Sequence, residues 1–150
     1  MALVHTHLYA SGEIDNLDLK DYFDTLLGEL VQSYQYITGK INYSIEIEET
    51  VRFMDLNIII PCGLIVNELV TNSIKHAFED LHSAQISIFL RPIGSALRFE
   101  YRDNGKGIDE ASLNGGSFGM DLLEILSNQI GKDIHHENDN GYRCHFTLNH

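Results

Sequence analysis

The sequence of 150 residues has little cysteine, little positive charge and no long apolar run. Its two cysteines, Cys62 and Cys144, are too few for a disulfide framework and share no metal-ligand spacing with the eight histidines, so we interpret both as reduced core thiols. Ten basic against 22 acidic residues give a net charge of -12, which argues against nucleic acid as a partner because phosphate binding needs basic clusters. No apolar run approaches the ~20 residues of a membrane span, and the N-terminus does not resemble a signal peptide, so we expect no membrane contact by this domain.

What is present suffices for one folded domain, since 43% of the residues are hydrophobic. Apolar periodicity predicts three helices, over residues 18–39, 61–78 and 119–130. Asp18 is the expected N-cap of the first, Pro61 should begin or kink the second, and Gly131 should cap the third. Alternation predicts about five strands, near residues 43–47, 85–91, 96–102, 133–137 and 143–148. Because hairpins exclude an all-parallel sheet, we predict an α+β two-layer sandwich, a mixed five-stranded sheet covered on one face by three α-helices.

The helix predicted over residues 61–78 organises the chain, because it combines an apolar side with an unusual polar one. Glu68, Asn72 and Lys75 are four and three residues apart, so they project from a single face that carries an acid, an amide and an amine. Thr71 and His76 flank them. A solvated helix face would look the same, and this segment alone leaves that alternative open.

A glycine-rich pentapeptide directly follows the strand predicted at residues 96–102, with the sequence Asp103-Asn104-Gly105-Lys106-Gly107. Asn-Gly is typical of a hairpin turn, but no alternating segment follows in residues 108–116, so we do not expect a hairpin. Glycines let a backbone approach a ligand closely. The carboxylate of Asp103 can accept a hydrogen bond from an exocyclic amine such as that of adenine.

A second glycine-rich run, residues 115–119, opens the third predicted helix. A helix N-terminus exposes unpaired backbone N–H groups and the positive end of the helix dipole, which suits phosphate. An ordinary loop before a helix remains the alternative for this run by itself. The sequence thus has three polar clusters, in the helix of residues 61–78 and in the runs 103–107 and 115–119. All three are much less expected together by chance than any one of them is alone.

Taken together, these stretches resemble the N, G1 and G2 boxes of the ATP-binding domain of histidine kinases. They are NELVTNSIKHAF at residues 67–78, DNGKG at 103–107 and GSFG at 116–119. The pattern is most similar to two-component sensor kinases that lack a separate F box, and the resemblance runs from about Leu3 to the end of the chain. It implies the Bergerat fold, which gyrase, the large heat-shock chaperone and the mismatch-repair ATPases share.

The resemblance implies ATP and Mg2+ as ligands. Asn72 would coordinate the Mg2+ that bridges the phosphates, Lys75 would reach a phosphate, and His76 would lie near the nucleotide. Asp103 would bind the adenine amino group, and Glu68 would orient or polarise the acceptor imidazole. The other nucleotide-binding positions that the resemblance implies are Asn67, Gly105, Gly107, Gly116, Ser117, Phe118 and Gly119. Because the domain is so acidic, we expect nucleotide binding to depend strongly on the cation.

The resemblance also implies an ATP-dependent protein-histidine kinase of two-component signal transduction. Its γ-phosphate would pass to a histidine on a separate dimerisation domain of the same protein, with a response regulator acting indirectly. We expect the full-length protein to be a homodimer, this domain to be cytoplasmic, and the parent to be either soluble or membrane-bound. No acceptor-histidine motif is present, so we expect no autophosphorylation by this chain alone. Residues 1–12 are expected to be a remnant of the dimerisation or phosphoacceptor helix, and residues 13–150 the ATP-binding catalytic domain.

Two departures from the family pattern concern the edge of the nucleotide site. Relatives usually have Gly-Thr where this chain has Gly141-Tyr142, which puts the adenine contact of that threonine in doubt. The loop of residues 108–114 is short, and the small residues from Gly105 to Gly119 predict mobility until ATP binds. Two other functions remain open: a serine protein kinase of the anti-sigma-factor type with the same fold, and a non-catalytic nucleotide-binding or docking module.

Overall fold

The computed structural model describes residues 17–38, 40–78, 83–109 and 118–149. Its centre is a five-stranded sheet in the order β2-β4-β5-β7-β6. The strands are β2 (Ile41–Ile47), β4 (Ala84–Ile93), β5 (Ala96–Asp103), β6 (Gly131–Asn138) and β7 (Tyr142–Leu148). Strand β2 pairs with β4 in parallel, and the other neighbours pair antiparallel. The predicted mixed five-stranded sheet is therefore confirmed.

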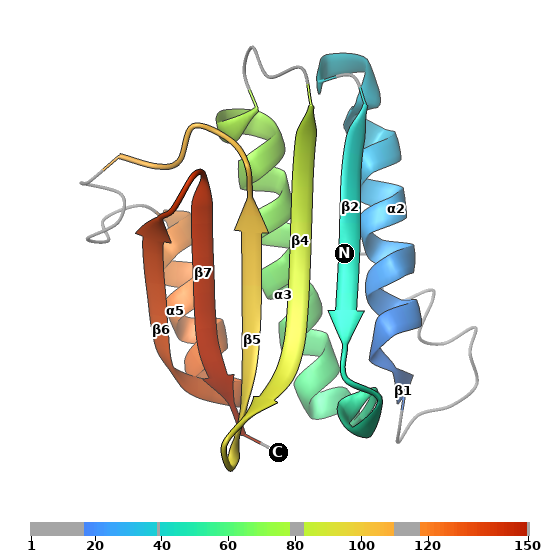
Figure 1. Cartoon of the computed structure of the whole chain (residues 1–150), viewed down its shortest axis with the longest axis vertical. Coiled ribbons are helices and arrows are strands. Elements are labelled where there is room, and N and C mark those ends of the chain that lie inside the picture. Colours follow the sequence, from blue (N-terminus) through green and yellow to red (C-terminus); the bar gives the residue numbers. More distant parts are fainter. Residues whose placement is uncertain (1–16, 39, 79–82, 110–117, 150) are drawn as a thin grey trace.

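The α-helices that the structure describes cover one face of this sheet, as Figure 1 shows. They are α2 (Leu19–Thr38), α3 (Leu56–Asn72) and α5 (Phe118–Ile130), with α3 packed between the other two. Asp18 caps α2 as predicted, because its Oδ1 accepts the N–H groups of Lys20 at 3.0 Å and Asp21 at 3.3 Å. The two-layer α+β arrangement is confirmed, and among the described residues the opposite face of the sheet carries no helix.

The alternation of strand β5 explains where the core lies. Leu97, Phe99 and Tyr101 are fully buried and point to the helices, whereas Arg98 and Arg102 alternate with them and face the open side. The ring of Phe99 lies 4.9 Å from that of Phe146 on β7 and 6.3 Å from that of Phe23 on α2. These aromatic contacts join the sheet to the helical layer, so the end of β5 has a defined position relative to α3.

Helix α3 begins earlier than the sequence pattern predicts. Asp55 is its N-cap and accepts the N–H of Asn57 at 2.7 Å, so the helix starts at Leu56 and Pro61 lies inside it. Of the two alternatives for Pro61, that it begins the main helix was wrong, because the capping carboxylate lies upstream, and that it kinks the helix stays a prediction. After Asn72 the chain continues as a π-helical turn, Ser73–Ala77.

The continuous helix of residues 56–77 is also long and apolar enough to cross a membrane by length and composition. The most apolar 18-residue window of this 22-residue helix has a mean hydropathy of 1.3, so the expectation that no stretch approaches a membrane span was too strict. Half of its most apolar window is buried in the domain, which accounts for this composition.

Gly131 is not a helix cap. It is the first residue of β6, paired with Leu148, and a Cβ built on it would lie 1.9 Å from the carbonyl oxygen of Thr147. The chain therefore passes from α5 directly into a strand, and close backbone approach explains the glycine. A small antiparallel pair, β1 (Leu17–Asp18) with β3 (Phe53–Met54), was also not predicted, since two-residue strands leave no periodic signal.

Candidate functional site

The polar face of α3 forms one wall of the candidate site. Asn67, Glu68 and Asn72 are half-buried, and Lys75 and His76 are exposed on the π-helical turn that follows. The acid, amide and amine predicted to share a face are thus presented along one helix.

The first turn of α5 lies against this wall. A Cβ built on Gly119 would lie 2.5 Å from Oε1 of Glu68 and 3.4 Å from Nδ2 of Asn72. Only a glycine lets the backbone come this close without displacing the glutamate. The structure therefore brings together two of the three predicted clusters, which are about 50 residues apart in sequence.

Asp103, at the end of β5, is a buried carboxylate with an exposed fraction of 6%. Its Oδ1 accepts the backbone N–H groups of Gly105 at 2.9 Å and Tyr142 at 3.0 Å, and its Oδ2 accepts the hydroxyl of Ser73 at 2.7 Å. An ionised carboxylate has about four acceptor positions, so Oδ2 retains one for a ligand donor. This geometry suits the predicted contact with an exocyclic amine.

The loop after β5 is tied to α3 and to β6. Lys106 donates its backbone N–H to the carbonyl of Ala77 at 3.0 Å. The side chain of Asn138 bonds the backbone of Ile108 in both directions, at 2.9 Å and 2.7 Å. Gly107 has a φ of +81°, a conformation that favours glycine. The second predicted cluster is thus held against the π-helical turn that follows α3.

Tyr142 takes part in the site through its backbone only. Its hydroxyl contacts Nδ1 of His136, and burial raises the pKa of Tyr142 and lowers that of His136. The tyrosine hydroxyl therefore pairs with the imidazole of His136 on β6, whereas what Asp103 accepts from Tyr142 is the backbone N–H. Whether Tyr142 replaces the adenine contact of the usual threonine stays a prediction to be tested.

Sequence reasoning missed two residues, Ser73 and Tyr101. Their exposed fractions are 3% and 0%, and their hydroxyl oxygens lie 2.6 Å apart beside Asp103. One signal was present: Ser73 lies four residues after Leu69, on the apolar side of the helix, where a polar residue needs a partner.

Several predicted positions lie outside the described residues. They are residues 1–12, Gly116, Ser117 and the loop of residues 110–114. Phe118 begins α5, but its side chain is also outside the described set.

The residues present fit a nucleotide with Mg2+. Among the described residues, no group of three or more His, Cys, Asp or Glu could hold a metal by itself. Mg2+ usually binds one or two protein oxygens and takes the rest of its shell from phosphates and water, and Asn72 and Glu68 offer oxygen donors of the kind it prefers.

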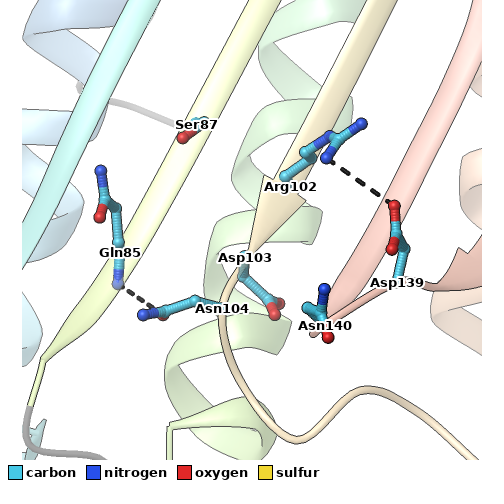
Figure 2. A pocket seen from close by; sticks show the side chains of 7 residues that line it. All are labelled: Gln85, Ser87, Arg102, Asp103, Asn104, Asp139 and Asn140. Atoms are coloured by element: carbon cyan, nitrogen blue, oxygen red, sulfur yellow. Dashed lines mark hydrogen bonds and ion pairs between the residues drawn. The ribbon is translucent and has the colours of Figure 1, made fainter.

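A separate pocket of about 440 Å³ lies at the end of β5. Figure 2 shows its lining side chains, which are Gln85, Ser87, Arg102, Asp103, Asn104, Asp139 and Asn140. Arg102 reaches Asp139 at 3.9 Å, and the side chain of Asn104 accepts the backbone N–H of Gln85 at 2.8 Å. Of the predicted site residues only Asp103 lines this pocket, which opens on the sheet face away from the helices.

Comparison with known proteins agrees with the geometry. The family model described as histidine kinase-, DNA gyrase B-, and HSP90-like ATPase matches residues 58–150. A second model, described as histidine kinase, matches residues 1–34 and so extends into α2.

Individual relatives are similar but distant. The blue-light-activated histidine kinase 2 of Erythrobacter litoralis is 25% identical over 111 residues, which are 72% of this chain and 32% of the relative. The histidine kinase domain of the Erythrobacter litoralis EL346 blue-light activated histidine kinase has a TM-score of 0.68 at 23% identity, over 88% of this chain and 61% of that one. The catalytic domain of histidine kinase ThkA has a TM-score of 0.70 at 16% identity, over 91% and 95%. These structures share the fold, and this chain spans about a third of the curated relative's length.

Proposed function

Because the chain belongs to the family of histidine kinase-, DNA gyrase B- and HSP90-like ATPases, we propose that it is the ATP-binding catalytic domain of a sensor histidine kinase. The observation that carries the proposal is the meeting of Glu68 and Asn72 with the first turn of α5, beside a buried Asp103. The match of residues 1–34 to a histidine kinase model supports this reading over the other ATPases of the family.

The nucleotide would lie between the polar face of α3 and the end of β5. Asp103 would bind the adenine amine, Asn72 would hold Mg2+ against the phosphates, and Lys75 would neutralise a phosphate oxygen. Asn67 and His76 would lie near the nucleotide, and Gly105, Gly107 and the 116–119 segment would surround it. Phosphoryl transfer asks a protein mainly for such positioning and charge neutralisation.

In the proposed reaction, the bond between the γ-phosphorus and the β,γ-bridging oxygen breaks and a phosphorus–nitrogen bond to an acceptor imidazole forms. ADP leaves, and the second imidazole nitrogen gives up its proton to a base. Glu68, half-buried on the site wall, is placed to orient that imidazole and take the proton. We expect Glu68→Gln to slow transfer and to leave ATP affinity nearly intact; an unchanged transfer rate would contradict this role.

The acceptor histidine would lie on a dimerisation domain of the same protein, with the full-length protein a homodimer that signals to a response regulator. We place the catalytic domain in the cytoplasm, where ATP is available. Residues 1–12 would be the end of the acceptor-domain helix, and residues 13–150 the catalytic domain.

Calorimetric titration with a non-hydrolysable ATP analogue, with and without Mg2+, tests the proposal. We expect Mg2+-dependent binding that Asn72→Ala and Asp103→Ala both weaken. Asn57→Ala is the matched control, because Asn57 is exposed at the far end of the same helix. Absence of binding by the folded wild-type domain would contradict the proposal.

The chemistry of the product separates the two kinase readings. Phosphate transferred to an acceptor protein should be labile to acid if it is on histidine and stable to acid if it is on serine. Acid-stable product would favour the anti-sigma-factor type of serine kinase, and tight nucleotide binding with no transfer to any acceptor would favour a docking module.

A further inference from the structure

Ser73 is a polar residue in a position that normally holds an apolar one. It is 3% exposed and begins the π-helical turn at the end of α3. A serine in a helix usually faces solvent or bonds a carbonyl of its own preceding turn. Ser73 instead donates its hydroxyl across the domain, to Oδ2 of Asp103 on β5, at 2.7 Å. π-helical turns are rare and occur frequently at functional sites.

Each hydroxyl group has one proton to donate, and this fixes the direction of the hydrogen bonds among Tyr101, Ser73 and Asp103. The carboxylate of Asp103 can only accept, so the single hydroxyl proton of Ser73 goes to it. The oxygens of Tyr101 and Ser73 are 2.6 Å apart, so Tyr101 donates to Ser73; its contact with the carbonyl of Leu69 is longer, at 3.3 Å. Burial raises the pKa of Tyr101 well above its usual value, which keeps this proton in place. A chain of donors thus runs from Tyr101 through Ser73 to Asp103.

The other oxygen of Asp103 is already saturated. Oδ1 accepts two backbone N–H groups, from Gly105 and Tyr142. Those two bonds fix the position of Oδ1, and the bond from Ser73 fixes the plane of the carboxylate by holding Oδ2. One acceptor position on Oδ2 remains, and it takes an exocyclic amine but repels a carbonyl oxygen. Adenine presents an amine at this position of the purine ring, and guanine presents a carbonyl.

We propose that Ser73 is a positioning residue that sets the preference of the nucleotide site for adenine over guanine, by holding Asp103 in the one orientation that requires a donor. Tyr101 supports it by holding the serine hydroxyl. This inference rests on the proposed function, because it concerns the same nucleotide site.

The test compares the affinities of the domain for non-hydrolysable ATP and GTP analogues with Mg2+ present. Ser73→Ala should weaken ATP-analogue binding about five- to tenfold, the size expected for one ordinary hydrogen bond because the carboxylate itself remains, and should lower the ratio of ATP to GTP affinity. Its Mg2+ dependence should not change, because the phosphate end of the site is intact. Ser73→Cys keeps a weak donor in a larger side chain and should fall between serine and alanine.

Ser127→Ala is the matched control. Ser127 is a fully buried helical serine, but its hydroxyl donates to the carbonyl of Glu124 in its own helix, at 3.1 Å. Its loss should leave the affinity ratio as in the wild type. Thermal unfolding confirms that each variant is folded, and if Ser73→Ala does not fold, Ser73→Cys and Tyr101→Phe provide the test.

A double-mutant cycle tests the chain of donors. Tyr101→Phe should lower the ATP-to-GTP ratio about two- to threefold in the wild type and should have no further effect in the Ser73→Ala background, because Tyr101 acts through Ser73.

The outcomes separate the inference from the function on which it rests. If the wild-type domain binds neither analogue, the proposed function fails. If the wild type binds ATP and Asp103→Ala weakens it, but Ser73→Ala keeps the wild-type ratio, only the role of Ser73 is overturned. Equal losses of ATP and GTP affinity in Ser73→Ala would overturn it as well, because they would show a purely structural serine.

Discussion

Strand β5 carries two buried carboxylates, Glu100 and Asp103, which differ in what holds them. Their exposed fractions are 1% and 6%, and they point to opposite faces of the sheet. Glu100, on the open face, is held by two guanidinium groups, of Arg143 at 2.7 Å and Arg102 at 2.9 Å. Asp103, on the helix side, is held only by two backbone N–H groups and one serine hydroxyl.

The difference separates a structural carboxylate from a binding one. Burial raises the pKa of Glu100, but the hydrogen bonds from Arg143 and Arg102 outweigh burial and lower it overall. Arg143 also forms an ion pair with Glu137 at 2.8 Å. The charge of Glu100 is therefore balanced by ion pairs inside the domain. Asp103 has no cationic partner among the described residues, and it keeps an acceptor position for a ligand. A carboxylate with neutral donors and spare acceptor capacity is therefore a stronger indication of a binding site than one in a salt bridge.

The largest effect is expected from Asp103→Asn. The amide keeps the volume and one acceptor oxygen but presents N–H groups where Oδ2 lies, so it repels the adenine amine and suits a carbonyl. ATP-analogue affinity should fall by at least about tenfold, while GTP-analogue affinity falls less or rises. Calorimetry with both analogues measures the change. Unaltered ATP affinity in this variant would remove Asp103 from the site.

Glu100→Gln is the matched change on the other face, and it should leave nucleotide affinity unaltered. The amide places a donor against a guanidinium donor and removes the charge that both arginines share. Because these arginines are partly exposed and can rehydrate, we expect a loss of about 2 to 3 kcal/mol in the free energy of unfolding. Urea denaturation measures the loss. Weakened ATP binding in a stable Glu100→Gln variant would contradict the assignment of Glu100 as a purely structural carboxylate.

Most of the fold and the skeleton of the site were predictable because they depend on local patterns. Alternation placed the five main strands, and the spacing of Glu68 and Asn72 correctly put them on one helix face. The start of α3 was missed because the cap at Asp55 precedes a proline that looks like a boundary. Ser73 and Tyr101 were missed because their roles arise from contacts between segments 28 residues apart, which no local period records.

A smaller effect should appear as a dependence of stability on pH. Burial lowers the pKa of His136, and burial together with Arg98 and Arg143 lowers that of His145. Because the folded-state values are lowered, the unfolded chain binds more protons, so stability is full above the unfolded pKa of about 6.5 and falls as pH drops through the folded values.

The contribution of Glu100 follows the same sign at lower pH. Its lowered pKa means that its contribution is present above the unfolded value of about 4.3 and is lost as pH falls through the folded value. Urea unfolding at a series of pH values should show both steps. His136→Gln with His145→Gln should remove the upper step, and Glu100→Gln the lower one. A wild-type stability that is flat between pH 7 and pH 5 would contradict the histidine assignment.

The smallest effect on binding is expected from Tyr142→Phe, which isolates the backbone contribution of β7 to Asp103. The variant keeps the N–H that donates to Oδ1 and removes only the hydroxyl that contacts His136. ATP-analogue affinity should change by less than about twofold, while the free energy of unfolding falls by about 1 kcal/mol because one buried hydrogen bond is lost. Calorimetry and urea unfolding on the same preparation measure the two quantities. A tenfold loss of ATP affinity would contradict a backbone role for Tyr142 at Asp103 and would show that its hydroxyl acts on the nucleotide site through His136.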